Sequence, residues 1–308
     1  MNMPLYIKLY EKGKLLAIKD NLLKRLKSCQ LCPRDCKVNR LKDEVGFCKT
    51  GRFAVVSSYN LHFGEEPPLV GKGGSGTIFF TWCNLGCLYC QNYTISHLGE
   101  GRQVKPAELA EIMLYLQKQG AHNINFVTPT HVVTQIIEAL ILAVEKGLKL
   151  PLVYNSGGYD ESSTLKEIDG IFDIYMPDAK YSDGHFSFRY SKAKDYWQVC
   201  QDALLEMHRQ VGNLVMDEYG IAKRGLLIRH LVLPNRIAGS FKVLDFIAKS
   251  ISKDSYVNIM EQYRPCFKAY AFEELSRGII KEEFDEVLEH AEKLGLHRGF
   301  YQKGTPHS

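Results

Sequence analysis

Short β-rich runs alternate with helical periodicity from about residue 76 onward, and few folds accommodate such a pattern. The alternation is typical of strand–helix units repeated around a parallel sheet. Several runs are almost continuously apolar, as expected of strands that are covered on both faces. The expected strands are residues 76–82, 123–128, 150–156, 171–177, 225–233 and 256–262, and the expected helices are residues 106–119, 131–147, 196–214, 240–251 and 281–294.

The chain before residue 76 has a different character, and we predict an N-terminal appendage at 1–75 beside a main domain at 76–308, which ends in a helix and tail. A basic helical stretch, Leu5 to Lys27, precedes a cysteine-rich loop. The glycine-rich run at 71–76 leads into a strand and lacks Walker spacing, so we interpret it as a turn rather than a phosphate cradle. The acidic segment His62–Pro68 either lines the substrate side or is a solvated loop, and the loop is the favoured interpretation.

Composition and charge exclude several classes of protein. The 308 residues are 45% hydrophobic and 24% charged, which does not fit a disordered chain. The net charge of +4, from 39 Lys and Arg against 35 Asp and Glu, is too small to indicate a nucleic-acid partner. The N-terminal residues form no apolar signal core, and no apolar run is long enough to span a membrane. We therefore expect a cytoplasmic protein with no membrane partner.

The cysteines indicate metal or redox chemistry. Seven of the nine lie between Cys29 and Cys90, and only Cys200 and Cys266 lie elsewhere. An odd number of cysteines without a signal peptide argues against a disulfide framework, because cytoplasmic thiols stay reduced.

Directly after the first expected strand comes a C-x3-C-x2-C motif formed by Cys83, Cys87 and Cys90. Thiolates are the natural ligands of iron–sulfur clusters, and three of them would leave the fourth iron open to an exogenous ligand. An incomplete ligand set indicates catalysis, as an open position does at zinc. The alternatives are an electron-transfer cluster completed by Cys200 or Cys266, or a zinc site.

At these residues the sequence resembles the radical S-adenosylmethionine (SAM) superfamily, and in particular the PflX-type relatives of pyruvate formate-lyase activating enzyme. The resemblance extends over almost the whole chain and is carried by CQLCPRDCKVNR, CNLGCLYCQN, VTPTH, YNSGGY, IYMPDAKYSD, RHLVLPN and NIMEQYRP. It implies an α/β fold with a partial (β/α)6 TIM-like barrel. It also implies a [4Fe-4S] cluster whose unique iron chelates SAM, and a 5′-deoxyadenosyl radical that abstracts hydrogen from the substrate.

The resemblance assigns roles to several residues. Cys83, Cys87 and Cys90 would hold the cluster, and Tyr89 would lie near the adenine of SAM. In the M-x-D-x-K pattern, Lys180 would pair with the SAM carboxylate and Asp178 with a cation or the SAM pocket. From the residues alone, a structural ion pair at the barrel rim is the alternative.

The carboxyl ends of barrel strands build the active site, and polar residues follow the other expected strands as well. Thr130 follows the second, and Asn155 and Ser156 end the third. We predict that these three bind the cofactor, although Thr130 is also suited to cap a helix and the other two to form a turn. His230, within the fifth strand, is expected to be a core histidine.

A second group, Cys29, Cys32, Cys36 and Cys48, supplies four thiols in twenty residues. That number completes a zinc site or ligates a second iron–sulfur cluster. Cysteines without a metal are the alternative.

These observations predict a radical SAM enzyme with an unknown substrate, which could be a glycyl-radical enzyme, another protein or a small molecule. The contrasting hypothesis is a non-catalytic iron–sulfur protein that transfers electrons or delivers a cluster. The two differ in the number of cysteines around the radical-motif cluster, which is three in the enzyme and four in the carrier. The enzyme would need a reductase or a flavodoxin or ferredoxin as its electron donor.

Overall fold

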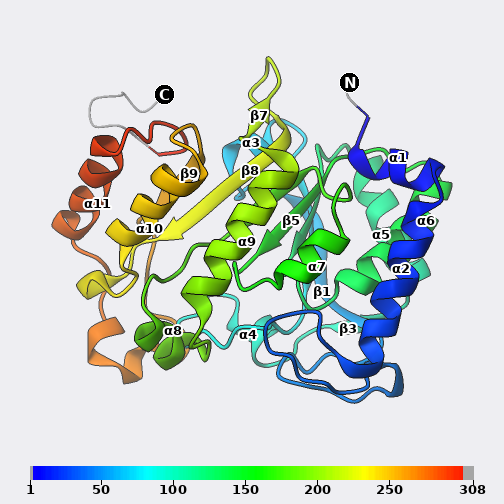
Figure 1. Ribbon diagram of the computed structural model, residues 1–308, viewed down its shortest axis with the longest axis horizontal. Coiled ribbons are helices and arrows are strands. Elements are labelled where there is room, and N and C mark those ends of the chain that lie inside the picture. The colour runs from blue at the N-terminus through cyan, green and yellow to red at the C-terminus, as the bar shows by residue number, and fades with distance from the viewer. Residues whose placement is uncertain (1–2, 301–308) are drawn as a thin grey trace.

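The computed structural model describes residues 3–300, so the last eight residues of the predicted C-terminal tail lie outside them (Figure 1). Its strands are β1 Ala54–His62, β2 Ser75–Phe80, β3 Arg102–Val104, β4 Ile124–Val127, β5 Leu152–Ser156, β6 Ile174–Pro177, β7 Val215–Met216, β8 Ala222–Leu231 and β9 Tyr256–Met260. Its α-helices are α1 Leu5–Glu11, α2 Lys14–Arg25, α3 Pro67–Val70, α4 Tyr93–Ser96, α5 Pro106–Lys118, α6 Val133–Glu145, α7 Ser162–Glu167, α8 Gly184–Ser191, α9 Tyr196–Val211, α10 Ser240–Phe246 and α11 Lys281–Lys293.

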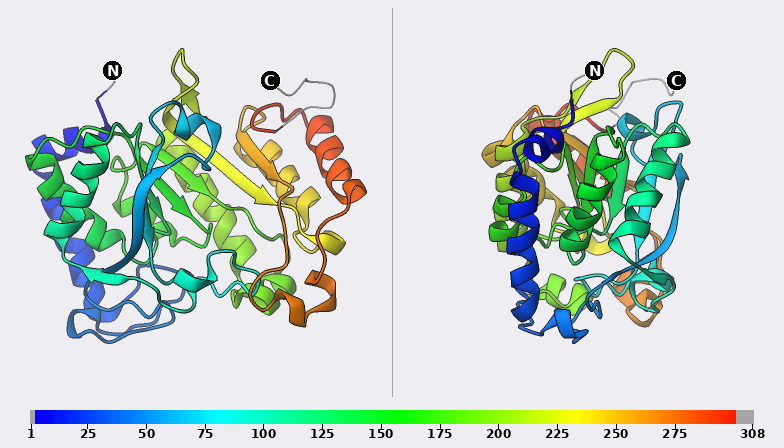
Figure 2. Two further views of the ribbon diagram at one scale, coloured as in Figure 1. Left: turned by 180° about the vertical axis from the view of Figure 1, so that it is seen from behind. Right: turned by 90° about the vertical axis from the view of Figure 1, so that its right-hand side faces the viewer.

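Six strands form the parallel core of the sheet in the order β2, β4, β5, β6, β8 and β9. They coincide with the six predicted strand regions, so the α/β prediction of a partial (β/α)6 barrel is confirmed. Every residue of β5 and β6 is buried, which explains their continuous apolar character. Helices α5, α6 and α9 cover the outside of the sheet (Figures 1 and 2).

The residues before β2 join this sheet. Strand β1 runs antiparallel to β2 and also pairs with β3, and neither β1 nor β3 was predicted. Helices α1 and α2 pack on α6, and the backbone N–H of Leu5 donates to Asp173 at 2.9 Å. A domain boundary at residue 75 remains a prediction.

Several local predictions need correction. Helix α6 begins at Val133 with Val132 as N-cap, so neither Thr130 nor His131 opens it. Strand β6 begins at Ile174 because residues 171–173 belong to the preceding turn. Helix α8 was missed, although Asp183 caps it by accepting hydrogen bonds from two backbone N–H groups.

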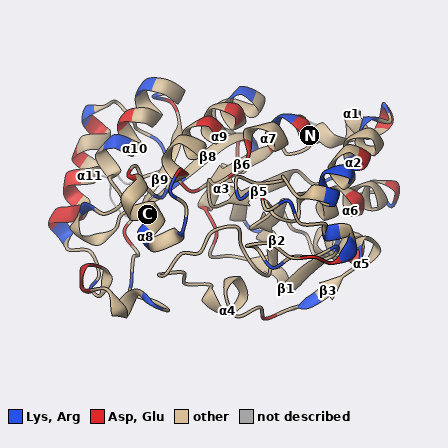
Figure 3. Cartoon of the chain, turned by 60° about the horizontal axis from the view of Figure 1, so that its bottom comes forward, with Lys and Arg blue, Asp and Glu red and all other residues tan. Residues whose placement is uncertain are grey.

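The charged residues lie mainly on the outer helices, where both signs are interspersed along α9 and α11 (Figure 3). Among residues 3–300 there is no helix with the length and apolar character needed to cross a membrane.

Candidate functional site

The C-x3-C-x2-C loop of Cys83, Cys87 and Cys90, called the radical-motif loop below, leaves the carboxyl end of β2. It is held by backbone hydrogen bonds to two other segments. Gly86 N–H donates to Ser191 O at 3.1 Å and Leu88 N–H donates to Tyr190 O at 2.8 Å, which fixes the loop on α8. From the opposite side, Lys268 N–H donates to Leu88 O at 2.9 Å. The loop is therefore positioned by parts of the chain that lie far apart in the sequence.

Each of the three sulfurs in this loop lies beside a hydrogen-bond donor. Cys83 Sγ faces the backbone N–H of Leu85 at 3.3 Å. Cys87 Sγ accepts from the Ser191 hydroxyl at 3.0 Å, and Cys90 Sγ from the Ser96 hydroxyl at 3.2 Å. Hydrogen bonds to an ionised acceptor are stronger than those to a neutral one, so this arrangement suits thiolates.

Burial opposes ionisation of the same thiols unless a cation accompanies them. It raises the pKa of Cys83 to about 12, and it also raises the pKa of Cys87 although Lys180 acts in the opposite direction. Binding to iron deprotonates a thiol outright. The loop therefore fits the three thiolate ligands of an iron–sulfur cluster.

Tyr89, inside the motif, is buried at 6% exposure. Its ring meets those of Tyr181 and Tyr263 edge to face, with centroids 6.3 and 5.9 Å away. These contacts fix the ring beside the cysteines, and its place near an adenine stays a prediction.

The predicted Asp178 and Lys180 lie together at the end of β6. Lys180 Nζ is 2.6 Å from Asp178 Oδ2, and Arg229 Nε is 2.8 Å from Asp178 Oδ1. Burial favours the neutral acid, but the cations Arg229 and Lys180 outweigh it and lower the pKa of Asp178. Asp178 is thus a carboxylate, and Lys180 has Cys87 near it as well.

Arg229 extends this cluster into the barrel and was not singled out from the sequence. Its Nη2 donates to Asn155 Oδ1 at 2.8 Å, and its Nη1 is 3.2 Å from Glu65 Oε1. Glu65 Oε2 accepts from Asn125 at 2.9 Å and from Asn155 at 3.2 Å. The predicted Asn155 therefore belongs to a network that links β4, β5 and β8.

The solvated-loop interpretation of residues 62–68 is wrong for its two acidic residues. The Glu65 side chain is 10% exposed and Glu66 is 7% exposed. Asn258 Nδ2, on β9, lies 2.8 Å from both carboxylate oxygens of Glu66. Burial raises the pKa of Glu66 although Asn258 stabilises the charged form.

The predicted Thr130 and Ser156 meet at a buried carboxylate, Asp160, which sequence reasoning missed. Asp160 accepts hydrogen bonds from Thr130 at 2.6 Å, from Ser156 at 2.5 Å and from Tyr154 at 3.0 Å. Burial raises the pKa of Asp160. Both predicted hydroxyls are thus donors to Asp160, and their part in cofactor binding stays a prediction.

The other candidate residues from the sequence, one histidine and two cysteines, differ in how deeply they are buried. His230 is fully buried, with Ala179 O 2.6 Å from Nδ1 and Ser240 Oγ 2.8 Å from Nε2, as expected of a core histidine. Cys200 is fully buried, whereas Cys266 is half-buried in the segment that contacts the radical-motif loop through Lys268.

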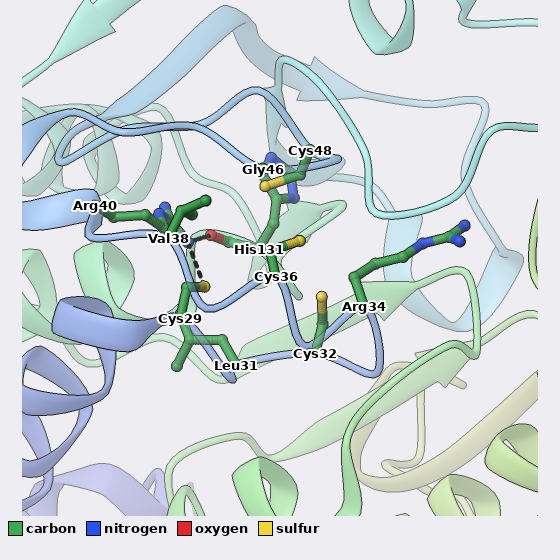
Figure 4. A pocket seen from close by; sticks show the side chains of 10 residues that line it. All are labelled: Cys29, Leu31, Cys32, Arg34, Cys36, Val38, Arg40, Gly46, Cys48 and His131. Atoms are coloured by element: carbon green, nitrogen blue, oxygen red, sulfur yellow. Dashed lines mark hydrogen bonds between the residues drawn. The ribbon is translucent and has the colours of Figure 1, made fainter.

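The four N-terminal cysteines line one hollow (Figure 4). It is lined by Cys29, Leu31, Cys32, Arg34, Cys36, Val38, Arg40, Gly46, Cys48 and His131. Gly46 is required because a Cβ there would lie 2.6 Å from Cys36 Sγ. Burial raises the pKa of Cys32 and Cys48 and lowers that of His131 to about 4.

Within the described part of the chain, no three Cys, His, Asp or Glu side chains converge closely enough to share a single metal ion. This applies to both cysteine groups. The thiolates of a cubane each bind a different iron, so a cluster does not require such convergence.

Comparisons with known proteins agree with this geometry. Residues 77–192 match the family model of the Radical SAM superfamily. The chain is 34% identical over 298 residues to the uncharacterized protein MJ0674 of Methanocaldococcus jannaschii, which covers 93% of this chain and 81% of that protein. It is 26% identical over 157 residues to the uncharacterized protein MJ0808 of the same organism, of which it spans 46%.

Among solved structures, a radical SAM methyltransferase from Sphaerobacter thermophilus has the same fold. The alignment has a TM-score of 0.51 at 12% identity and covers 74% of this chain and 66% of the other. At this identity the likeness extends to the fold alone.

Proposed function

We propose, from the premise that this chain belongs to the radical SAM superfamily, that it cleaves SAM reductively and abstracts a hydrogen atom from a substrate. The observation that carries the proposal is the position of Cys83, Cys87 and Cys90, in one loop at the carboxyl end of β2 and close to Lys180. Bound there, a [4Fe-4S] cluster and SAM would supply one electron and a 5′-deoxyadenosyl radical.

The residues around the loop have separate tasks in this proposal. Lys180 would hold the SAM carboxylate as a compact cation. Asp178 would keep the ammonium group of Lys180 in place, and Arg229 would fix Asp178 from its other carboxylate oxygen. The hydroxyl groups of Ser96 and Ser191 would stabilise the ligating thiolates. Asn155 would orient Arg229 from β5.

A role as the activating enzyme of a glycyl-radical protein is the narrower form of the proposal. It is favoured by the Met176, Asp178 and Lys180 pattern shared with such activating enzymes. The non-catalytic alternative is favoured by one observation, the half-buried Cys266 in the segment that packs on the radical-motif loop. A fourth thiolate from this residue would close the site to SAM.

The proposal includes a cytoplasmic location and a one-electron donor such as flavodoxin, ferredoxin or a reductase, with nine free cysteines as support for reducing surroundings. It also includes a metal at Cys29, Cys32, Cys36 and Cys48, either zinc or a second iron–sulfur cluster.

The decisive experiment uses the anaerobically reconstituted protein. The EPR spectrum of the reduced cluster should change when SAM is added, because SAM occupies the open iron. Incubation with a reductant and deuterium-labelled extract from a deletion strain should transfer deuterium into 5′-deoxyadenosine and so identify the substrate. A spectrum that is indifferent to SAM would remove the enzyme proposal and leave the electron carrier.

A further inference from the structure

The hollow among the four N-terminal cysteines contains a buried positive charge without a balancing anion. Arg40 is 1% exposed, and it donates to Gly51 O at 3.0 Å and to His131 O at 2.8 Å. Its Nη2 has no partner, and none of the ion pairs among residues 3–300 includes Arg40. Burying an unpaired guanidinium is costly, so this site requires negative charge inside the hollow.

The only groups positioned to supply that charge to Arg40 within the hollow are the thiols. Arg40 Nη1 lies 3.9 Å from Cys29 Sγ, and both residues line the hollow (Figure 4). A neutral thiol would leave the guanidinium uncompensated, whereas four thiolates around a metal centre carry net negative charge. The buried arginine therefore points to bound metal rather than to unligated cysteines.

The sulfur of Cys36 also faces a donor. The backbone N–H of Phe47 lies 3.5 Å from Cys36 Sγ. A neutral thiol is a weak acceptor, whereas a metal-bound thiolate accepts such a hydrogen bond well.

A second buried polar atom borders the same hollow without a partner. His131 is 1% exposed, and its Nδ1 makes no hydrogen bond. Its Nε2 lies 3.0 Å from Thr81 O, two residues before Cys83. His131 thus connects the hollow to the start of the radical-motif loop.

Arg34 makes a second connection on the other side of Cys83. Arg34 lies two residues after Cys32 in the chain, and its Nε donates to Asn84 O at 2.8 Å. Its Nη2 donates to Ser191 O at 3.3 Å, and the hydroxyl of Ser191 is bound to Cys87 Sγ. A short path of covalent and hydrogen bonds therefore runs from one cysteine group to the other.

The spacing of the four sulfurs separates the two candidate metals. A zinc ion bonds its four sulfurs at about 2.3 Å, which brings them together around one point. Among the described residues, no three Cys, His, Asp or Glu side chains converge in this way, although the four thiols line one hollow. A cubane, whose irons each take one thiolate, suits this wider arrangement.

We propose that Cys29, Cys32, Cys36 and Cys48 ligate a second [4Fe-4S] cluster that relays single electrons to the radical-motif cluster. The inference rests on the proposed function. Held by these four residues, the second cluster would take one electron from reduced flavodoxin and return to its oxidised form by passing that electron to the radical-motif cluster. The same electron would be consumed when the bond between sulfur and C5′ of SAM breaks, giving methionine and the 5′-deoxyadenosyl radical without proton transfer.

The electron would enter at the outer side of the hollow. Cys36 is half-buried, and the neighbouring Val45 and Phe47 are 52% and 41% exposed. These apolar side chains offer a contact for a protein donor close to the second cluster.

The test compares cysteine variants of the full chain after anaerobic reconstitution. Wild type and the matched control Cys200→Ala should hold about eight irons, and Cys32→Ser should lose about four. SAM cleavage by Cys32→Ser should fall at least tenfold more with reduced flavodoxin than with dithionite, which is small enough to reach the radical-motif cluster directly. Loss of one zinc and no iron would overturn the cluster, and equal losses with both reductants would overturn the relay.

Three further variants keep the outcome decisive if Cys32→Ser does not fold. The triple variant Cys83→Ser, Cys87→Ser, Cys90→Ser should retain about four irons and an EPR signal that SAM does not change, so the second cluster is tested even if SAM cleavage fails in the wild type. Arg40→Lys should keep the reduction potential of that cluster near the wild-type value, whereas Arg40→Gln should lower it because a positive charge is lost. Equal potentials in all three proteins would contradict the role of Arg40.

Discussion

Arg34 Nε donates a 2.8 Å hydrogen bond to the carbonyl oxygen of Asn84, the residue that directly follows Cys83. The same guanidinium also donates to Ser191 O and Lys192 O, and it lies 3.7 Å from the ring centre of Phe47. The N-terminal cysteine loop and the radical-motif loop are thus joined by one side chain, and Figures 1 and 2 show both at the same end of the molecule.

Arg34→Ala should loosen both loops together. Hydrogen bonds from a charged group are worth about 1.5–3 kcal/mol each, and the partial exposure of Arg34 reduces their sum, so we expect the free energy of unfolding to fall by about 2 kcal/mol. Limited proteolysis should cut near residues 29–52 and 83–90 sooner than in the wild type. The control is Lys42→Ala, an exposed lysine of the same segment, and equal cleavage in both variants would refute the joint role of Arg34.

Lys180→Ala should weaken SAM binding by more than the ~1 kcal/mol of an exposed ion pair, because its site is largely buried. Isothermal titration of the reconstituted protein measures this. Lys249→Ala is a matched control, since Lys249 has the same 2.6 Å separation from an aspartate but is 65% exposed. If SAM affinity is the same in both variants, Lys180 only neutralises Asp178.

Cys266→Ala distinguishes the enzyme from the electron carrier. If three cysteines ligate the radical-motif cluster, this variant should keep the iron content and the SAM-dependent EPR change of the wild type. If Cys266 is the fourth ligand, removal of its thiol should instead create an open iron, and SAM would alter the spectrum of the variant only.

The sequence was sufficient for the parts of the fold and site that depend on local pattern. The apolar runs predicted β5 and β6 because both faces of these strands are buried, and the cysteine spacing predicted the radical-motif loop. Strand β1 was missed because only Ala54 and Val56 of its nine residues are buried, while the other seven are exposed or half-exposed, so the strand contains no continuous apolar run.

Contacts between residues far apart in the sequence could not be predicted in the same way. Arg229 and Glu65 are 164 residues apart, and only the fold of the whole sheet brings the segment after β1 next to β8. Asp160 is close to Ser156 in sequence, yet its role depends on Thr130 from another strand end. Polar residues inside the barrel are recognisable only when their partners are known.

The last prediction concerns the pH dependence of the contact between the N-terminal helix and the barrel. Asp173 accepts hydrogen bonds from Leu5 N–H at 2.9 Å and Leu152 N–H at 3.0 Å. Burial raises the pKa of Asp173 from 3.8 to about 6, and these hydrogen bonds only partly offset it. Since the folded state holds the proton more tightly, this residue contributes stability that is full below pH 3.8 and is lost as the pH rises to about 6.

Asp173→Asn should remove this dependence. The amide cannot ionise, and its NH2 group faces one of the two backbone N–H donors, so the variant should be less stable than the wild type throughout. The stability advantage of the wild type over the variant should shrink by about 1 kcal/mol between pH 5 and pH 7.5 and stay constant at higher pH. Urea unfolding followed by the fluorescence of Trp82 and Trp197 measures the difference. An advantage that grows with pH would show that Asp173 is stabilised as the carboxylate, and that its hydrogen bonds to Leu5 and Leu152 outweigh its burial.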